Sequence, residues 1–148
     1  MITTITAADR PRWTELWRAY LAFYETDLSP SIYDHTWSRL MQDHELHAYA
    51  ARAANDPASE IIGITHFLYH PSGWTLTPAC YLQDLYVAPE ARGQGVARTL
   101  IEAVAAHART QKAARLYWLT QTHNATARLL YDRVAKYTGF IRYEYPSL

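Results

Sequence analysis

The sequence predicts an α/β (or α+β) domain, in which a mixed and mostly antiparallel sheet carries helices on both faces. Residues 47–87 contain β-type segments separated by short turns, as in an antiparallel meander. Residues 81–120 then alternate strand, amphipathic helix and strand, as in a crossover between parallel strands. A chain of 148 residues that is 49% hydrophobic fits one compact domain, which we place over residues 1–148.

The N-terminal part predicts a short strand followed by two helices. Residues 2–6 are β-prone, and Asp9 and Pro11 suit the first turn of a helix. Large apolar side chains then recur at helical spacing, namely Trp13, Leu16, Trp17, Tyr20 and Tyr24. Ser29 and Pro30 supply the N-cap and first residue of a second helix. The apolar positions of that helix are Tyr33, Trp37, Leu40 and Met41.

The rest of the chain predicts strands and helices in turn. The expected strands cover residues 47–53, 60–69, 81–87, 116–120 and 140–145. The turns Asn55-Asp56-Pro57 and Pro71-Ser72-Gly73 separate the first three of them. The expected helices cover residues 95–110 and 124–134, the first with a clear apolar face.

Composition narrows the class of protein. The formal net charge is zero, which gives no sign of a polybasic nucleic-acid surface. We find neither an apolar run long enough to span a membrane nor an N-terminal signal pattern. The single cysteine, Cys80, excludes an intramolecular disulfide framework and suits a reducing compartment. We therefore expect a soluble cytoplasmic protein that binds neither nucleic acid nor membrane.

Residues 92–98 predict a phosphate cradle. The run Arg92-Gly93-Gln94-Gly95-Val96-Ala97-Arg98 follows a strand and opens a helix. Glycines at such a turn let backbone N–H groups approach an anion, and the helix N-terminus adds partial positive charge. The run lacks the Lys-Ser/Thr of a Walker A motif and the third glycine of a dinucleotide fingerprint. Alone, these glycines also fit an ordinary strand-to-helix turn.

Several motifs resemble the GNAT superfamily of N-acetyltransferases. The family signature Gln/Arg-x-x-Gly-x-Gly/Ala is matched by Arg92, Gly95 and Ala97. It follows the strand end Asp84-Leu85-Tyr86-Val87 and the turn Pro89-Glu90. The closing motif is matched by Asn124, Ala127, Leu130-Tyr131 and Gly139-Phe140, with residues 132–138 longer than the family pattern. The resemblance covers about residues 80–142 and is closest to the branch of yeast histone and D-amino-acid acetyltransferases.

The resemblance implies the GNAT fold, with a splayed strand in the sheet, and acetyl-CoA as co-substrate. In this family the splayed strand, here Leu85, Tyr86 and Val87, pairs with the pantetheine arm, and a backbone N–H polarises the thioester carbonyl. The pyrophosphate would lie on the N–H groups of Gly93, Gln94, Gly95, Val96 and Ala97, flanked by Arg92 and Arg98. Read without the family, the same strand is ordinary buried core.

Two residues of the closing motif receive roles from the resemblance. Tyr131 would be the general acid that protonates the departing thiolate. From its apolar helical neighbours alone, Tyr131 would be a core residue. Asn124 would hydrogen-bond the pantetheine, while its position equally fits a helix N-cap. The two readings of Asn124 do not exclude each other.

The general base is less evident. The polyamine acetyltransferases carry a glutamate where this chain has Gln83, which cannot usefully accept a proton. Asp84 follows, but strand alternation predicts that it points to the opposite face of the sheet. Glu25 and Tyr24, at the end of the first helix, could reach the acceptor side. We expect a water-relayed route through Asp84 or Glu25, although either carboxylate also fits a solvated or capping role.

The resemblance implies direct attack of an amine on acetyl-CoA in a ternary complex. The expected acceptor is a small amine, a polyamine or an amino acid; a protein lysine or N-terminus is the alternative. A non-catalytic acetyl-CoA-binding module is the competing class, which Gln83 favours and Tyr131 opposes. Ile141, Tyr143 and Tyr145 alternate with charged residues, so we expect a homodimer paired through C-terminal strands. The histidines form no complete ligand set, and we expect no metal.

Overall fold

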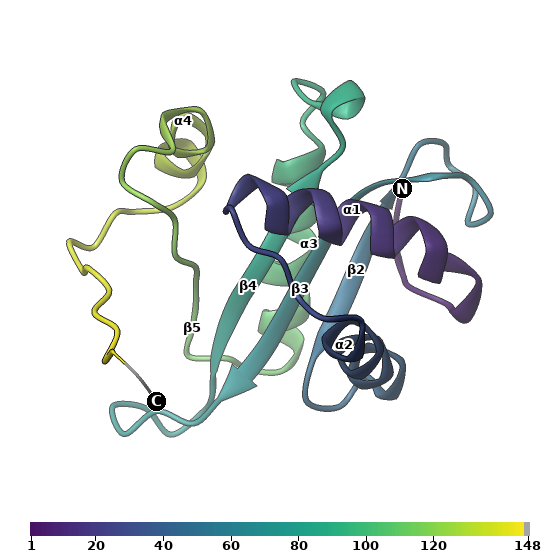
Figure 1. Ribbon diagram of the computed structural model, residues 1–148. Helices are drawn as coiled ribbons and strands as arrows, with labels where there is room; N and C mark the ends of the chain where they lie inside the picture. Colours follow the sequence, from purple (N-terminus) through teal and green to yellow (C-terminus); the bar gives the residue numbers. More distant parts are fainter. Residues whose placement is uncertain (147–148) are drawn as a thin grey trace.

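The computed structural model describes residues 1–146, and its centre is a five-stranded sheet (Figure 1). The strands lie in the order β1 (Ile2–Thr4), β2 (His47–Arg52), β3 (Ile61–His70), β4 (Ala79–Val87) and β5 (Arg115–Tyr117). The first four are antiparallel, and β5 runs parallel to β4 after a helical crossover. The prediction of a mixed, mostly antiparallel sheet is confirmed.

Helices cover both faces of this sheet. The helices of the described chain are α1 (Arg10–Phe23), α2 (Pro30–Gln42), α3 (Val96–Thr110) and α4 (Ala125–Val134). Helices α1 and α2 lie on one face and α3 on the other, while α4 follows β5 at one side of the sheet (Figure 1). Ser29 is the N-cap of α2 and Pro30 its first residue, as predicted, because proline pre-sets the helical φ where no N–H is needed.

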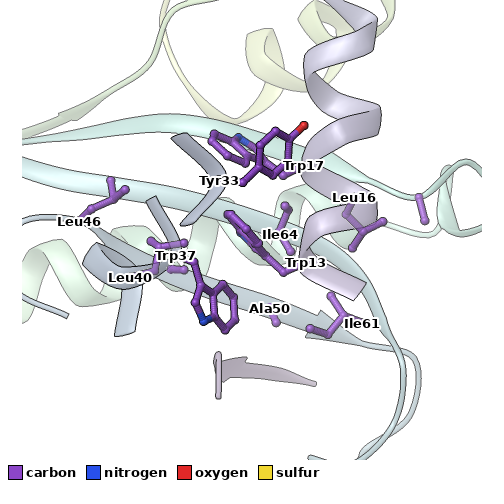
Figure 2. Close-up of a cluster of buried hydrophobic side chains, with 12 residues drawn as sticks. Trp13, Leu16, Trp17, Tyr33, Trp37, Leu40, Leu46, Ala50, Ile61 and Ile64 are labelled. Atoms are coloured by element: carbon purple, nitrogen blue, oxygen red, sulfur yellow. The ribbon is translucent and has the colours of Figure 1, made fainter. Parts of the chain in front are cut away.

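An aromatic cluster fixes α1 and α2 against the sheet. Trp13 is fully buried, and its ring centroid lies 5.0 Å from those of Trp17 and Trp37. Tyr33 of α2 meets Trp17 edge to face at 4.8 Å (Figure 2). Such rings bury large apolar areas and leave few alternative packings. The first half of α1 is thereby held against the sheet.

Helix α3 packs closely on the opposite face. Leu100 and Val104 are fully buried there. A Cβ added at Gly63 of β3 would lie 3.1 Å from the Tyr86 carbonyl oxygen and 3.2 Å from Val96. Only glycine therefore allows the start of α3 to approach the sheet this closely. This contact places the N-terminus of α3 next to the end of β4.

Strand β4 contains one extra residue at Gln83. In the pairing with β3, His66 lies opposite Asp84 and Phe67 lies opposite Leu82, so Gln83 has no partner. A bulge of this kind interrupts the alternation of side chains. Gln83 and Asp84 consequently line the same cavity on the α1 side. The expectation that Asp84 faces away from Gln83 is wrong, because alternation holds only in a regular ladder.

Strands β4 and β5 separate soon after they meet. Residues 79–81 pair with residues 115–117, and within the described chain the remainder of β4 has no strand partner on that edge. Beyond Tyr117 the chain leads away toward α4 (Figure 1). The splayed strand expected from the family resemblance is confirmed at residues 82–87.

The C-terminal part departs from the sequence expectation. Strand β5 ends at Tyr117 instead of residue 120, and residues 140–145 form no strand. A three-residue strand that turns away from the sheet offers little edge for another strand to join. Phe140, Ile141, Tyr143 and Tyr145 remain exposed as a result. The predicted final strand is therefore wrong for the single chain.

Candidate active site

A cavity of about 510 Å³ lies where β4 and β5 begin to separate. Its lining comes from α1, β4, the start of the splay and the C-terminal segment: Tyr20, Tyr81, Gln83, Asp84, Tyr117, Leu119 and Arg142. A second cavity of about 410 Å³ lies between α1 and α2 and includes none of the predicted site residues. The first cavity is therefore the candidate active site.

Asp84 is the principal charged group in this cavity. Its side chain is 14% exposed, and its carboxylate Oδ2 lies 2.9 Å from Nδ1 of His66. Burial, followed by the nearby negative charge of Asp84, raises the pKa of Tyr20 and of Tyr24. Both phenols stay protonated at neutral pH and can act as hydrogen-bond donors there. The site thus combines one carboxylate with neutral donors from the end of α1.

Tyr131 is a partly buried residue of α4. Its ring packs edge to face on Trp118, and it belongs to the apolar cluster that covers the α3 face. Burial, with a smaller contribution from Tyr24, raises the pKa of Tyr131 to about 12. The phenol is therefore protonated at neutral pH, as a proton donor must be.

Asn124 stands at the N-cap position of α4, but its side chain does not cap the helix. Its backbone carbonyl accepts the N–H of Arg128 at 3.1 Å. Its side-chain Nδ2 donates instead to Oγ1 of Thr120 at 3.2 Å, across the turn before α4. The amide oxygen of Asn124 makes no hydrogen bond within residues 1–146 and can accept one from a ligand.

Glu25 does not join these residues. It follows the end of α1 in the left-handed conformation, with φ of 53°, and is exposed. It is not part of the cavity lining. Tyr20 and Tyr24, one turn apart on α1, are the residues that approach Asp84 from this helix. Of the two carboxylates that the sequence offered as bases, only Asp84 lies in the cavity.

The turn before α3 has the geometry of an anion cradle. Gly93 and Gly95 have φ of 74° and 80°, and a Cβ on either would meet no atom within 4 Å. No backbone N–H from residues 93 to 98 is bonded to an acceptor within the described chain. Open space above free N–H groups at a helix N-terminus is what a phosphate needs.

Two arginines flank the cradle. The guanidinium of Arg92 donates from Nε to the carbonyl of Val87 at 3.1 Å and lies over the ring of Tyr86. Arg98 pairs instead with Glu102 one turn along α3, with both side chains largely exposed. Arg92 is thus held at the junction of β4 and the cradle, while Arg98 lies further along the helix.

The backbone of β4 offers free groups toward the splay. The N–H of Ala88 donates to the Ile62 carbonyl of β3 at 2.9 Å. Because backbone groups alternate along a strand, the N–H groups of Leu85 and Val87 point away from β3 and into the opening. Tyr86 between them packs on the α1 side. Leu85 and Val87 share the α3 face, as predicted.

Sequence reasoning missed His66 and Tyr20 as site residues. His66 and His70 both lie on β3, and their rings have separate partners. His70 bonds Tyr117 and the Pro71 carbonyl, while His66 bonds Trp13 and Asp84. Pairing the facing ends of the two predicted strands, residue 69 with residue 81, would have placed His66 opposite Asp84.

Residues 1–146 were also searched for a metal site and for a membrane-spanning helix. No three His, Cys, Asp or Glu side chains of this part of the chain lie where they could hold a metal ion. No helix in it is both long and apolar enough to cross a membrane.

Comparison with known proteins agrees with this geometry. Residues 11–137 match the acetyltransferase (GNAT) family. The chain is 33% identical over 144 residues to the D-amino-acid N-acetyltransferase HPA3 of Saccharomyces cerevisiae, which covers 97% of this chain and 89% of the yeast protein. It is 34% identical over 102 residues to a thialysine N-epsilon-acetyltransferase of Caenorhabditis elegans, covering 67% of this chain and 61% of that protein.

A solved structure extends the agreement to three dimensions. The aminoglycoside acetyltransferase AAC(6')-Iy, in complex with the bisubstrate analogue CoA-S-monomethyl-acetylneamine, matches with a TM-score of 0.84 at 16% identity. The match covers 100% of this chain and 98% of that one, so the fold is shared. Acetyltransferases of this family use acetyl-CoA. With a family match over most of its length and a nearly full-length yeast relative, the chain belongs to the acetyltransferase (GNAT) family and is an acetyltransferase.

Proposed function

We propose that this enzyme transfers the acetyl group of acetyl-CoA to the primary amine of a small acceptor, an amino acid in the first instance. The position of Asp84 is the observation that carries the proposal. Its carboxylate lies in the cavity, and the open edge of β4 begins directly beside it. An amine held there would have a proton acceptor on one side and the proposed cofactor edge on the other.

The cradle fits the diphosphate of acetyl-CoA. The open space above Gly93 and Gly95 admits phosphate oxygens, and the N–H groups of Gly93, Gln94, Gly95, Val96 and Ala97 would donate to them. Arg92 adds positive charge at the same point, and Arg98 can swing from Glu102 to add a second. We assign the diphosphate to this turn.

The edge of β4 fits the amide groups of the pantetheine arm. Leu85 and Val87 present N–H groups to the splay, and Tyr86 fixes the strand from the other face by packing under Arg92. The free amide oxygen of Asn124, across the opening, suits a further hydrogen bond to the arm. These groups would align an extended ligand along the strand toward Asp84.

Acetyl-CoA, when bound, supplies a thioester carbonyl for the amine to attack. Asp84 would accept the amine proton, directly or through a water held by Tyr20 and Tyr24. A free N–H of the β4 edge would donate to the carbonyl oxygen as its negative charge grows. Tyr131 would then give its phenol proton to the departing sulfur. The carbon–nitrogen bond forms, the carbon–sulfur bond breaks, and no covalent bond to the enzyme is needed.

The lining of the cavity supports an amino acid as acceptor. Asp84 and Arg142 supply opposite charges to one cavity, as the two charged ends of a zwitterion require. Tyr81 and Tyr117 stack with centroids 5.0 Å apart and form an aromatic wall for the side chain. Two relatives are named for substrates of this chemistry, a D-amino acid and thialysine.

We also propose that residues 1–148 form one domain that works as a cytoplasmic homodimer. The exposed Ile141, Tyr143 and Tyr145 could pair with a second copy, which would cover their apolar side chains. Cys80 is buried and free, which suits a reducing compartment. Sedimentation equilibrium tests the dimer: a monomer at every concentration would contradict it.

Thiol release from acetyl-CoA, measured against matched acceptors, tests the proposed function. The panel holds D- and L-amino acids, the amines obtained by removing their carboxylates, a polyamine and a lysine peptide. We expect the highest kcat/KM for an amino acid, and Arg142→Ala should remove its advantage over the matching amine. Thermal stabilisation by acetyl-CoA without turnover of any amine would indicate a non-catalytic module. Turnover of the peptide alone would indicate a protein acceptor.

A further inference from the structure

His66 is a polar ring in the middle of an aromatic core. It lies on β3, has no exposed surface, and packs between Trp13 and Trp17 with ring centroids 6.0 Å away in each case. A buried polar group destabilises a protein by about 1–3 kcal/mol unless it is hydrogen-bonded. Both ring nitrogens of His66 are bonded: Nε2 lies 2.8 Å from Nε1 of Trp13, and Nδ1 lies 2.9 Å from Oδ2 of Asp84.

Trp13 determines the tautomer of His66. An indole nitrogen can only donate a hydrogen bond, so Nε2 of His66 must accept one and carry no proton. The neutral ring then holds its proton on Nδ1, the nitrogen that faces Asp84. A second proton on Nε2 would oppose the Trp13 N–H. The direction of both hydrogen bonds is therefore fixed: Trp13 donates to His66, and His66 donates to Asp84.

The buried polar side chains of β3 converge on Asp84. Among the described residues, the buried polar or charged side chains are Arg52, Thr65 and His66. Thr65 donates from Oγ1 to the backbone carbonyl of Asp84 at 2.8 Å, and His66 donates to its carboxylate. One residue thus receives a bond to its backbone and a bond to its side chain from neighbours with no access to solvent.

The bulge explains why Asp84 needs this support. The extra residue at Gln83 lies directly before Asp84, which still pairs with His66, and it puts the Asp84 side chain on the cavity side of the sheet. The other groups near that carboxylate are the phenols of Tyr20 and Tyr24 from α1 and of Tyr81 from β4, and the cation of Arg142 lines the same cavity. His66 is the donor that reaches the carboxylate from the protein interior.

We infer that His66, oriented by Trp13, is a positioning residue that holds Asp84 as a carboxylate aimed at the acceptor amine. The inference rests on the proposed role of Asp84 as proton acceptor. The Nδ1–H bond fixes one carboxylate oxygen and leaves the other for the amine or its water. Hydrogen bonding to the charged form of an acid favours that form. His66 does not touch the acceptor itself.

Two substitutions separate positioning from packing. His66→Gln places an amide oxygen where Nε2 accepts from Trp13, but it has no donor in the place of Nδ1. His66→Asn places an amide N–H near Nδ1 and so retains the donor to Asp84. Both remove the ring, and Asn is shorter than Gln by one methylene group, so the effect on packing is measured for each. Thermal unfolding and acetyl-CoA affinity, measured on both, give the effect of the lost ring.

Steady-state kinetics across pH then reports on Asp84. We expect His66→Gln to lower kcat about tenfold, with a smaller change in KM for the amine. The acidic limb of kcat/KM should also move, because the carboxylate has lost the hydrogen bond from Nδ1 of His66. His66→Asn should lie nearer the wild type in both respects. Equal losses in the two variants with an unmoved limb, or wild-type behaviour of His66→Gln, would overturn the inference.

A spectroscopic readout keeps the inference testable without turnover. Long-range ¹H–¹⁵N spectra of the imidazole nitrogens should show His66 with its proton on Nδ1 at neutral pH. Trp13→Phe should allow the other tautomer to appear. A wild-type ring with its proton on Nε2, or with both nitrogens protonated, would overturn the inference whatever the substrate. A correct tautomer in an enzyme that turns over no amine would instead contradict the proposed function alone.

Discussion

The phenol ring of Tyr131 meets the indole ring of Trp118 edge to face, with centroids 5.4 Å apart and planes at 64°. Tyr131 belongs to α4, and Trp118 belongs to the segment that leaves β5 at the splay. Contacts of this geometry stabilise beyond the area they bury. The pair therefore fixes α4 on the far side of the opening from β4.

Tyr131→Phe should lower kcat about tenfold or more, because it removes the proposed proton donor while keeping the ring against Trp118. Affinity for acetyl-CoA should change little. Burial raises the pKa of Tyr131 to about 12, so the wild-type phenol should remain a donor throughout assays below pH 10. Tyr137→Phe, at an exposed position, is the control. Unchanged turnover of Tyr131→Phe would remove the assignment.

Asp84→Asn should lower kcat/KM for the amine about a hundredfold or more and abolish the acidic limb of the pH–rate profile. The amide keeps the size of the side chain but cannot accept a proton. Glu25→Gln should leave the profile as it is, because Glu25 is exposed and outside the cavity. Rate measurements from pH 5 to pH 10 compare the three proteins. If Glu25→Gln lost the acidic limb, Glu25 and not Asp84 would be the general base.

Gly95→Ala should weaken acetyl-CoA binding about tenfold while leaving KM for the amine nearly unchanged. The added Cβ meets no atom, so the effect comes from the φ of 80°, which costs a non-glycine residue about 1–2 kcal/mol. The backbone would relax and misdirect its N–H groups. Gly73→Ala is the matched control, since it too meets no atom within 4 Å and its φ is not positive. Titration calorimetry gives both affinities.

Asp9→Asn should destabilise the protein by about 3–5 kcal/mol at pH 7, because it leaves Arg52 buried without its counter-ion. Both carboxylate oxygens of Asp9 bond the Arg52 guanidinium, at 2.8 and 2.9 Å, and the two side chains are 10% and 5% exposed. Asp34→Asn, in an exposed pair with Arg10, should cost less than about 1 kcal/mol. Urea unfolding measures both, and similar small losses would contradict the argument.

The same pair gives a pH dependence of stability. Burial tends to raise the pKa of Asp9, but the hydrogen bonds from Arg52 and Thr6 outweigh it and hold the pKa below its ordinary 3.8. A carboxyl whose pKa is lower in the folded state contributes stability above pH 4, and this contribution is lost as pH falls through the folded value. The Tm of the wild type should therefore drop below about pH 4. The drop should be smaller in Asp9→Asn.

Most of the fold could be predicted because its elements leave local signals. Helix α1 follows from aromatic side chains at helical spacing, and the start of α2 follows from Ser29 and Pro30. The cradle was recognisable because Gly93 and Gly95 both need a positive φ at a strand-to-helix turn. Each of these signals involves residues close together in the chain, so it can be recognised in the sequence.

What could not be predicted depends on contacts between distant segments. The bulge at Gln83 is a property of the β3–β4 pairing, and nothing local to the residue marks it. His66 gained its role only when the fold brought Trp13 and Asp84 to its two nitrogens, 53 and 18 residues away. The missing strand at residues 140–145 had the right alternation but lacked a long enough partner in β5. The alternation of side chains in a segment does not show whether a neighbouring strand is available to pair with it.

The extra residue at Gln83 divides β4 into two halves of opposite parity. Before it, even-numbered residues such as Leu82 face α3; after it, odd-numbered residues such as Leu85 do. The half of β4 that begins the cavity and the half that leads to the turn before α3 are thus out of phase with each other. Deleting Gln83 would leave a regular ladder in which Leu82 and Leu85 still face α3 and Asp84 still faces the cavity. A deletion at another position of β4 would instead turn part of the strand inside out, exchanging core and cavity side chains along it.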